Sequence, residues 1–343
     1  MKKIALIVDT VNWAFYNNAN NIKKYLSEKY DVTIIPTSYL ENSLFHLYLL
    51  LEDYDLVHFF WRYELYYDNN EALDWILKED GLDKNRFLAD KLNYDKITTG
   101  VYDHLFIDDN FEITKSIFSR VKNYTVSSSK LLEIYNNLDL KYKPTRVITD
   151  GVNLELFYPI NLERFDFKKE RKIVIGWVGN SKWSGNFDHK GLKTILDPAI
   201  DELIDEGYNI TKNYADSNQG FIPYTEMVNY YSKIDILVCS SKSEGTPGPI
   251  LEAMACGVPI ISTDVGVVKD ALGKKQQKYI LKQRTVKEMK NKIKNMIKNI
   301  HQMKSLSDEN IKQAEKYSFK KIAKEYDEFF TRVMEEQKWI TRS

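Results

Sequence analysis

Glu244 and Glu252 stand on either side of a turn rich in glycine and proline, Gly245-Thr246-Pro247-Gly248-Pro249. Proline lacks the N–H group that a strand or helix interior uses, so this turn interrupts regular structure. Ile250 to Ala255 then favours a helix, whose first N–H groups and positive dipole end attract phosphate. A carboxylate accepts hydrogen bonds from sugar or ribose hydroxyls. The stretch indicates a site for a phosphorylated sugar, although two solvated glutamates beside an ordinary turn would have the same spacing.

Apolar runs on both sides of the turn predict the elements that position it. Ile234 to Cys239 has the composition of a buried parallel strand, and Ile260-Ile261 begins another. Gly257 and Pro259 end the intervening helix. We therefore predict strand, loop, helix and strand over this stretch.

The same alternation of short apolar runs and helical patterns extends along the whole chain. We expect strands at Ile4 to Val8, Val32 to Ile35, Leu56 to Phe60 and after Lys172, and helices at Asn20 to Tyr30, Leu44 to Leu51, Leu192 to Glu206 and Tyr224 to Tyr231. This pattern predicts doubly wound parallel α/β sheets. A chain of 343 residues suits two domains. We place them at 1–158 and 159–317, with Pro159 to Arg171 as linker and a closing helix at 318–343.

The overall composition is that of a water-soluble globular protein, with 43% hydrophobic and 29% charged residues. The apolar run after Lys2-Lys3 is too short for a signal peptide, and no run approaches the roughly 20 residues of a membrane span. The two cysteines, Cys239 and Cys256, form no disulfide framework and no metal-binding spacing. We expect a cytoplasmic protein without a bound metal or cofactor.

The formal net charge is zero, but the charges are unevenly distributed. Residues 41–112 hold 17 acidic and 6 basic side chains, whereas residues 269–304 hold 2 acidic and 12 basic ones. Within the basic segment, the pattern of residues 287–304 predicts an amphipathic helix, because Met289, Ile293, Ile297 and His301 recur at a spacing of four. Its basic face is either solvated or in contact with an anionic membrane surface or a phosphorylated acceptor. We expect no nucleic-acid partner, because the chain is neutral and this segment lacks interleaved aromatic residues.

Other polar residues follow predicted strands of the first domain. Ligands of doubly wound sheets bind beyond the carboxyl ends of the strands, and there we expect Asp9, Thr10, Asn12 and Trp13. The alternative is that Trp13 packs in a core.

Asp103 and His104 follow a later strand. Either could hydrogen-bond a sugar or accept a proton, or both could lie in a solvated loop. His58 lies inside an apolar run and is interpreted as a core residue, and Ser127 to Ser129 as a helix N-cap.

The pattern E-G-x-P-x-P-x-x-E-A-M-A-x-G-x-P-x-I-x-T-x-x-G, from Glu244 to Gly266, resembles the donor-site signature of the retaining glycosyltransferase family 4. The resemblance implies the GT-B fold of two Rossmann-like domains. It implies that Glu244 faces the transferred sugar and that Glu252 holds the ribose of a nucleotide. It also implies backbone contacts to the diphosphate or sugar from Gly245, Thr246, Pro247, Gly248 and Pro249. Many relatives have a Phe-Gly pair within this turn, and this chain does not, so its sugar pocket differs.

The resemblance extends to three further places. Gly179 ends the first strand of the second domain, and Lys182 and Lys190 match two cations that clamp the donor diphosphate without a metal; a longer loop separates them here. The family often has His-Asp near the reacting sugar, where this chain has Asp103-His104. The C-terminal residues resemble a closing helix that packs on the first domain.

The resemblance therefore implies a retaining glycosyltransferase that uses a nucleotide sugar such as a UDP-sugar. Its catalytic residues would be Glu244, Asp103, His104 and Lys190, with the leaving diphosphate taking the acceptor proton. The opening Asp9-Thr10-x-x-Trp13-Ala14 resembles a subset of bacterial surface-polysaccharide transferases, so the expected acceptor is a glycan or glycolipid. Two alternatives stay open, a non-catalytic scaffold that binds a sugar nucleotide or a membrane, and a sugar-nucleotide epimerase of the same fold.

Overall fold

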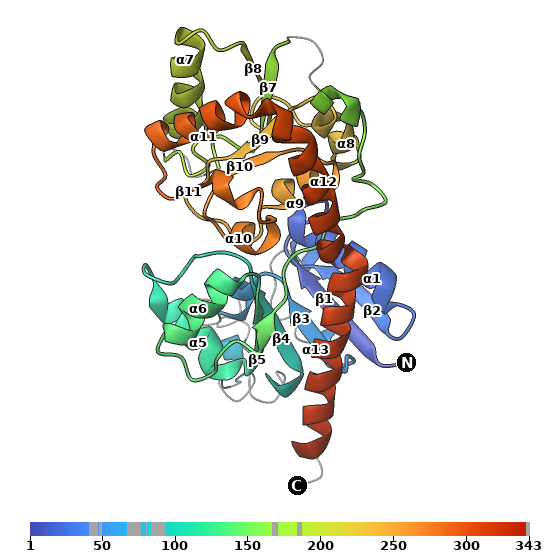
Figure 1. The fold of residues 1–343 in the computed structure, drawn as a ribbon. Helices are drawn as coiled ribbons and strands as arrows, with labels where there is room; N and C mark the ends of the chain where they lie inside the picture. The colour runs from blue at the N-terminus through green and yellow to red at the C-terminus, as the bar shows by residue number, and fades with distance from the viewer. Residues whose placement is uncertain are drawn as a thin grey trace. The chain divides into compact units, whose positions relative to one another are not determined.

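The computed structural model describes residues 1–40, 47, 50–66, 77–79, 81, 83, 94–166, 171–183 and 187–340. The chain forms two compact units, unit 1 with Met1–Asp150 and Phe319–Ser343, and unit 2 with Gly151–Ser318. Each unit is built around one parallel β-sheet (Figure 1). This architecture confirms the predicted α/β class with doubly wound parallel sheets.

The described part of unit 1 contains a six-stranded sheet in the order β2-β1-β3-β4-β5-β6, with every neighbouring pair parallel. The strands are β1 (Lys3–Val8), β2 (Asp31–Pro36), β3 (Leu56–Phe59), β4 (Ile97–Val101), β5 (Asn123–Val126) and β6 (Arg146–Val147). The strand order changes direction between β1 and β3. Ligands of such sheets bind at the carboxyl ends of the strands beside this switch point.

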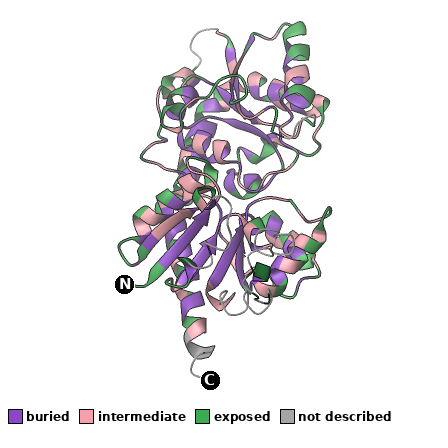
Figure 2. Ribbon diagram, turned by 180° about the vertical axis from the view of Figure 1, so that it is seen from behind, coloured by how far each residue is buried: buried purple, intermediate pink, exposed green. Residues whose placement is uncertain are grey.

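Helices cover both faces of the unit 1 sheet. Those whose bounds fall within the described residues are α1 (Ala14–Leu26), α5 (Phe111–Arg120), α6 (Ser129–Asn137) and α13 (Phe319–Ile340). Ile4 and Leu6 of β1 share a core with α1 and α13, whereas Ala5 and Ile7 share a second core with α5 and α6. Successive residues of a strand point to opposite faces, so the continuous apolar run of β1 serves both cores. Figure 2 shows the strands buried under helices that are exposed on their outer sides.

Helix α1 and the start of α6 compare with their predictions as follows from their contacts. The helix predicted at 20–30 begins at Ala14 and ends at Leu26. Its asparagine-rich start has a low intrinsic helix propensity, and burial of Ala19, Ile22 and Leu26 against the sheet stabilises it instead. The N-cap prediction is confirmed, because the Ser128 side chain accepts a hydrogen bond from Leu131 N, at 3.2 Å. The helix predicted at 44–51 lies largely outside the described residues.

The described part of unit 2 contains a five-stranded parallel sheet in the order β11-β10-β9-β7-β8. The strands are β7 (Ile173–Gly179), β8 (Ile210–Asp216), β9 (Ile236–Cys239), β10 (Ile260–Thr263) and β11 (Ile280–Leu281). The helices are α7 (Asp197–Asp205), α8 (Met227–Tyr231), α9 (Gly248–Ala255), α10 (Val268–Ala271), α11 (Val286–Lys298) and α12 (Met303–Ala314). One turn of π-helix, Leu192–Leu196, leads into α7, where Pro198 removes a backbone donor.

The basic segment 287–304 differs from its prediction. It forms α11, which ends at Lys298, and the chain turns before α12, so His301 lies outside the helix and is exposed. The buried stripe is Met289, Ile293 and Met296. Two of its lysines pair with acidic residues of α7: Lys290 Nζ lies 2.6 Å from Glu202 and 2.8 Å from Glu206, and Lys294 Nζ lies 2.7 Å from Glu206. Part of the basic face therefore pairs within unit 2.

The boundary between the units, at Asp150 and Gly151, precedes the one expected from the sequence. The expected linker, where it is described, packs in unit 2: Phe165 is buried, and Arg164 donates to the carbonyl oxygens of Ile234 and Tyr231, at 3.1 and 3.2 Å. Among the helices within the described ranges, none combines the length and apolarity needed to cross a bilayer.

Candidate functional site

The turn between β9 and α9 has the predicted form. The chain leaves β9 at Cys239, passes Glu244 and begins α9 at Gly248, with Pro249 in the first turn. Pro at this position is favourable because the first helical N–H groups have no partner within the helix. The helix dipole and the free N–H groups at this end form an environment suited to an anion.

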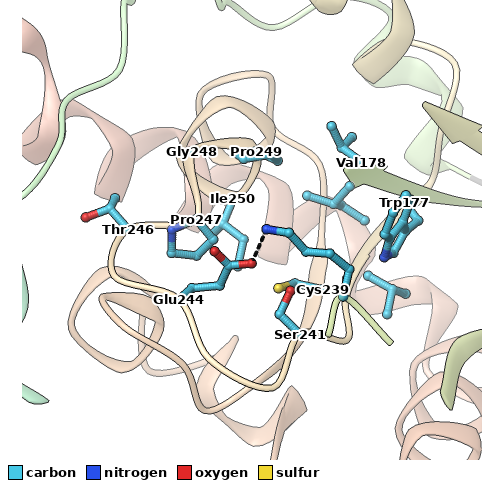
Figure 3. Close-up of a pocket in the computed structure, with 13 residues that line it drawn as sticks. Trp177, Val178, Cys239, Ser241, Glu244, Thr246, Pro247, Gly248, Pro249 and Ile250 are labelled. Carbon is cyan, nitrogen blue, oxygen red and sulfur yellow. Dashed lines mark hydrogen bonds and ion pairs between the residues drawn. The ribbon is translucent and has the colours of Figure 1, made fainter. Parts of the chain in front are cut away.

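Glu244 and Lys190 meet beside this turn, although 54 residues separate them. Lys190 Nζ lies 2.5 Å from Glu244 Oε1, and both side chains are largely buried, with exposed fractions of 23% and 17%. The dashed line at Glu244 in Figure 3 marks this ion pair. On another side, the Trp183 ring centre lies 5.8 Å from Lys190 Nζ. The Glu244 carboxylate and the Lys190 ammonium thus occupy one pocket.

This pocket brings together most, but not all, of the predicted donor residues. The predicted residues that line it are Lys190, Glu244, Thr246, Pro247, Gly248 and Pro249. The other lining residues are Trp177, Val178, Leu237, Val238, Cys239, Ser241 and Ile250. The lining does not include the other predicted donor residues, Gly179, Lys182, Gly245 and Glu252. Lys182 is exposed on the loop after β7, and Gly179 lines a neighbouring pocket with Val178, Ala215, Ser217, Gly220, Phe221, Ile222 and Met227.

Glu252 lies one helical turn inside α9 and is partly buried. The Tyr231 hydroxyl donates to Glu252 Oε2 at 2.6 Å. Burial raises the pKa of Glu252 from 4.5 to about 7, and the hydrogen bond from Tyr231 opposes that shift. Gly248 lies beside it, since a Cβ atom there would be 3.8 Å from Glu252 Oε1. Glu252 is therefore a carboxylate that extra hydroxyl donors would stabilise in its charged form.

Two glycines allow the loops of the site to approach closely. Gly191 has φ +69°, and a Cβ atom there would collide with the Ser240 carbonyl oxygen. Gly266 has φ +47°, and a Cβ atom there would collide with the Gly245 carbonyl oxygen. Both positions require a residue without a side chain, so the loops carrying Lys190 and Glu244 stay in contact with their neighbours.

Sequence reasoning missed the residues that hold these loops together. Arg284 donates from Nε to the Ser240 carbonyl oxygen at 2.8 Å and from Nη2 to the Asp188 carbonyl oxygen at 3.0 Å. Ser240 Oγ donates to the Lys190 carbonyl oxygen at 2.8 Å. Arg284 is a lone arginine in a lysine-rich stretch far along the chain, and nothing local in the sequence indicates this role.

In unit 1, the residues expected after β1 lie at the carboxyl edge of the sheet. Asp9 Oδ1 accepts a hydrogen bond from Thr10 N at 2.7 Å, and burial raises the pKa of Asp9. Asn12 has a left-handed backbone conformation, with φ +65°. Trp13 is 64% exposed, so the alternative that it packs in the core is wrong.

Glu64 adds a second carboxylate to this edge that the sequence did not indicate. The Thr37 hydroxyl donates to Glu64 Oε1 at 3.1 Å. Burial, and to a lesser extent the charge of Asp9, raises the pKa of Glu64. Aromatic rings lie nearby, with the Phe106 ring centre 6.4 Å from that of Trp61 and 5.4 Å from that of Tyr63.

The structure ties Asp103 to an arginine. Arg62 is 1% exposed and donates from Nη1 to Asp103 Oδ2 at 3.0 Å and from Nη2 to Asp103 Oδ1 at 2.7 Å. Arg62 Nη2 also donates to the Leu105 carbonyl oxygen at 2.7 Å. This bidentate pair fixes the loop that carries His104. His58 is fully buried, as expected, and its Nδ1 lies 3.0 Å from Thr98 Oγ1.

The sequence of unit 2 matches a known family. Residues 217–316 match the family model described as "Glycosyl transferases group 1". This range includes Glu244, Glu252 and the whole turn between β9 and α9.

Curated relatives agree with this match at low identity. The chain is 26% identical over 226 residues to N,N'-diacetylbacillosaminyl-diphospho-undecaprenol alpha-1,3-N-acetylgalactosaminyltransferase of Campylobacter jejuni, covering 59% of this chain and 58% of the relative. It is 36% identical over 83 residues to the putative teichuronic acid biosynthesis glycosyltransferase TuaC of Bacillus subtilis, covering 24% of this chain and 19% of the relative. The chain thus spans less than two thirds of the length of these relatives.

Solved structures resemble the whole chain. Sucrose-phosphate synthase from Thermosynechococcus elongatus has a TM-score of 0.70 at 16% identity, covering 97% of this chain and 99% of that one. Anabaena HepE, solved in complex with UDP, has a TM-score of 0.68 at 12% identity, covering 97% and 100%. At these identities the likeness concerns the fold. The paired α/β units and these likenesses show the GT-B fold, and within unit 2 residues 217–316 match the group 1 glycosyl transferases.

Proposed function

We propose that this protein transfers a sugar from a nucleotide-sugar donor to a hydroxyl group of a glycan or glycolipid acceptor, with retention of the anomeric configuration. The observation that carries the proposal is the meeting of Lys190 and Glu244 in one pocket, at the N-terminus of the helix that holds Glu252. A cation, a helix N-terminus and two carboxylates supply complementary contacts for a diphosphate, a sugar and a ribose.

In this proposal the diphosphate lies against the N-terminus of α9 and Lys190, and the transferred sugar lies against Glu244. Glu252 accepts hydrogen bonds from the ribose hydroxyls. The base occupies the neighbouring pocket beside Gly179 and Phe221. We favour uracil, because solved HepE complexes contain UDP and UDP-glucose.

The reaction breaks the bond between the sugar anomeric carbon and the diphosphate oxygen, and forms one from the acceptor oxygen to the same carbon on the same face. The acceptor proton passes to the leaving diphosphate. Lys190, the exposed Lys182 and the α9 N-terminus stabilise the negative charge that develops there. This route requires no bound metal.

We further propose that unit 1 binds the acceptor. Asp9 and Glu64 would accept hydrogen bonds from sugar hydroxyls, with Thr10, Asn12 and His104 as further polar contacts. The exposed Trp13 and the rings of Trp61, Tyr63 and Phe106 offer apolar faces to the C–H groups of a pyranose. Relatives that act on an undecaprenol-linked sugar and in teichuronic acid biosynthesis support a bacterial surface glycan as acceptor. In this proposal the enzyme works in the cytoplasm, and contact with an anionic membrane would use the lysines of 287–304 that do not pair with α7.

The first test is thermal stabilisation by UDP, GDP, ADP, CMP and dTDP and their sugars, without metal and then with magnesium. We expect one base to raise the melting temperature without metal. The shift should be lost in Glu252→Ala and reduced in Lys190→Ala. Stabilisation only with magnesium would contradict the lysine clamp.

A transfer assay separates this function from its alternatives. Release of nucleoside diphosphate that depends on an added acceptor supports transfer. Stabilisation without release would favour a non-catalytic scaffold, and interconversion of sugar epimers would favour an epimerase.

A further inference from the structure

The Lys190–Glu244 ion pair occupies the place that the proposed donor would fill. Both side chains line the same pocket, and Lys190 Nζ lies 2.5 Å from Glu244 Oε1 (Figure 3). Water reaches less than a quarter of either side chain, so their charges interact more strongly than an exposed pair would. Any ligand that recruits Lys190 competes with Glu244.

A nucleoside diphosphate and a nucleotide sugar differ in how they compete with Glu244 for Lys190. Both bring negative phosphate oxygens that attract Lys190 and repel Glu244. The nucleotide sugar also brings hydroxyl groups that donate hydrogen bonds to a carboxylate, and such bonds to a charged group are strong. The nucleoside diphosphate offers Glu244 no replacement for the lysine that it loses.

The surroundings of the pair favour its return to the same geometry. Ser240 Oγ donates a hydrogen bond to the Lys190 carbonyl oxygen at 2.8 Å, and Lys242 N donates one to the His189 carbonyl oxygen at 2.9 Å. Two hydrogen bonds thereby connect the loops that carry Lys190 and Glu244. With the loops held, exchange of the pair requires the movement of two side chains only.

We propose that Glu244 is a specificity determinant that distinguishes the nucleotide sugar from the nucleoside diphosphate product through competition for Lys190. Once the sugar has left, Glu244 has lost its hydroxyl donors and pairs with Lys190 again. This pairing weakens binding of the diphosphate. The ion pair thus favours product release. This inference rests on the proposed function, because it assumes that a nucleotide sugar binds in this pocket.

The test compares the dissociation constants of UDP and UDP-glucose by calorimetry for the wild type and for Glu244→Gln. The variant keeps the shape of the side chain and removes its charge. We expect UDP to bind about tenfold more tightly to the variant, because Lys190 no longer has to leave a charged partner and a like charge near the diphosphate is removed. UDP-glucose should bind equally or less tightly, because the carboxylate that its hydroxyls need is lost.

Two variants control the measurement. Glu206→Gln removes another glutamate of unit 2 that pairs with lysines, outside the pocket, and should change neither constant. Lys190→Met should weaken UDP binding and reduce the gain from Glu244→Gln, since no lysine remains to be released. A wild type that binds UDP more tightly than UDP-glucose, or a Glu244→Gln variant in which both constants change by the same factor, would overturn the inference.

A failure of the proposed function would give a different result in the same binding measurements. If no diphosphate and no nucleotide sugar in the panel stabilises the wild type, the pocket is not a donor site, and the inference fails with it. If both UDP and UDP-glucose bind and Glu244→Gln leaves both constants unchanged, the donor site stands and the role of Glu244 is wrong.

Discussion

At the scale of single residues, the two glutamates of the turn have different surroundings. Glu244 pairs with Lys190, whereas Glu252 accepts a hydrogen bond from the Tyr231 hydroxyl, and burial raises its pKa. The spacing of eight residues alone does not distinguish them. Their different environments suit a carboxylate that exchanges partners and a carboxylate that takes up hydroxyl donors.

Glu252→Gln tests the environment of the second carboxylate. The folded-state pKa of about 7 exceeds the ordinary value of 4.5, so this group's contribution to stability is fully present below pH 4.5 and is lost as pH rises through 7. The variant should therefore gain about 2 kcal/mol relative to the wild type between pH 5 and pH 8. Urea unfolding at both pH values measures it. A difference that does not change with pH would show that Glu252 titrates normally.

At the scale of elements, the pocket that Lys190 and Glu244 line depends on contacts between loops that are distant in sequence. The loop before α11 reaches back, through Arg284, to the end of β9 and to the loop that carries Lys190. We infer that Arg284 is a positioning residue for the Lys190–Glu244 pair.

Arg284→Ala should weaken binding of the nucleotide sugar by about tenfold or more, because small displacements in a site are costly. Arg284→Lys keeps the charge but not the two directional donors, so it should restore only part of the affinity. Calorimetry with UDP and UDP-glucose measures both variants. Lys282→Ala, at an exposed neighbour, should leave affinity unchanged. Equal binding by wild type and Arg284→Ala would contradict the positioning role.

A second contact between elements concerns Arg62 and Asp103 in unit 1. Arg62 is buried whereas the Asp103 side chain is 26% exposed. Asp103→Asn leaves the buried guanidinium without its carboxylate, so it should destabilise unit 1 by about 3–5 kcal/mol. Arg62→Met, which leaves a carboxylate that water reaches, should destabilise it by less. Chemical denaturation measures this. Arg332→Ala, which removes an exposed i,i+4 pair with Glu336, should cost less than about 0.5 kcal/mol. If Asp103→Asn abolished transfer with unchanged stability, Asp103 would act in catalysis.

At the scale of the whole molecule, the two units should respond oppositely to acid. His58 of β3 is buried against the rings of Tyr326 and Phe330 of α13, and burial lowers its pKa from 6.5 to about 3. Its contribution to stability is present above pH 6.5 and is lost as pH falls toward 3. Glu252 makes unit 2 more stable over part of the same range.

Calorimetry of unfolding at pH 7 and pH 5 tests this opposition. The transition of unit 1, identified by its response to Arg62→Met, should lose about 2 kcal/mol on acidification through His58. His58→Leu should remove that loss. A His58→Leu protein with the same pH dependence as the wild type would show that the pKa of His58 is the same in the folded and unfolded states.

The sequence by itself determined the α/β class, the element order around the turn and the identity of Glu244 and Glu252 as candidate ligands. These follow from local signals: apolar runs that mark buried strands, and glycine and proline that end helices. The start of α1 and the end of α11 were less well predicted, because burial against neighbouring elements decides where a weakly helical segment begins and ends.

Only the tertiary structure decided which side chains meet. It paired Lys190 with Glu244, placed Tyr231 on Glu252, used Arg284 to join two loops and tied Asp103 to the buried Arg62. Tyr231 and Glu252 lie on α8 and α9, on either side of β9. The other partners follow different strands of one parallel sheet, which collects the carboxyl ends of its strands at one edge. A charge needs a partner when water is excluded, and the identity of that partner depends on the fold rather than on sequence spacing.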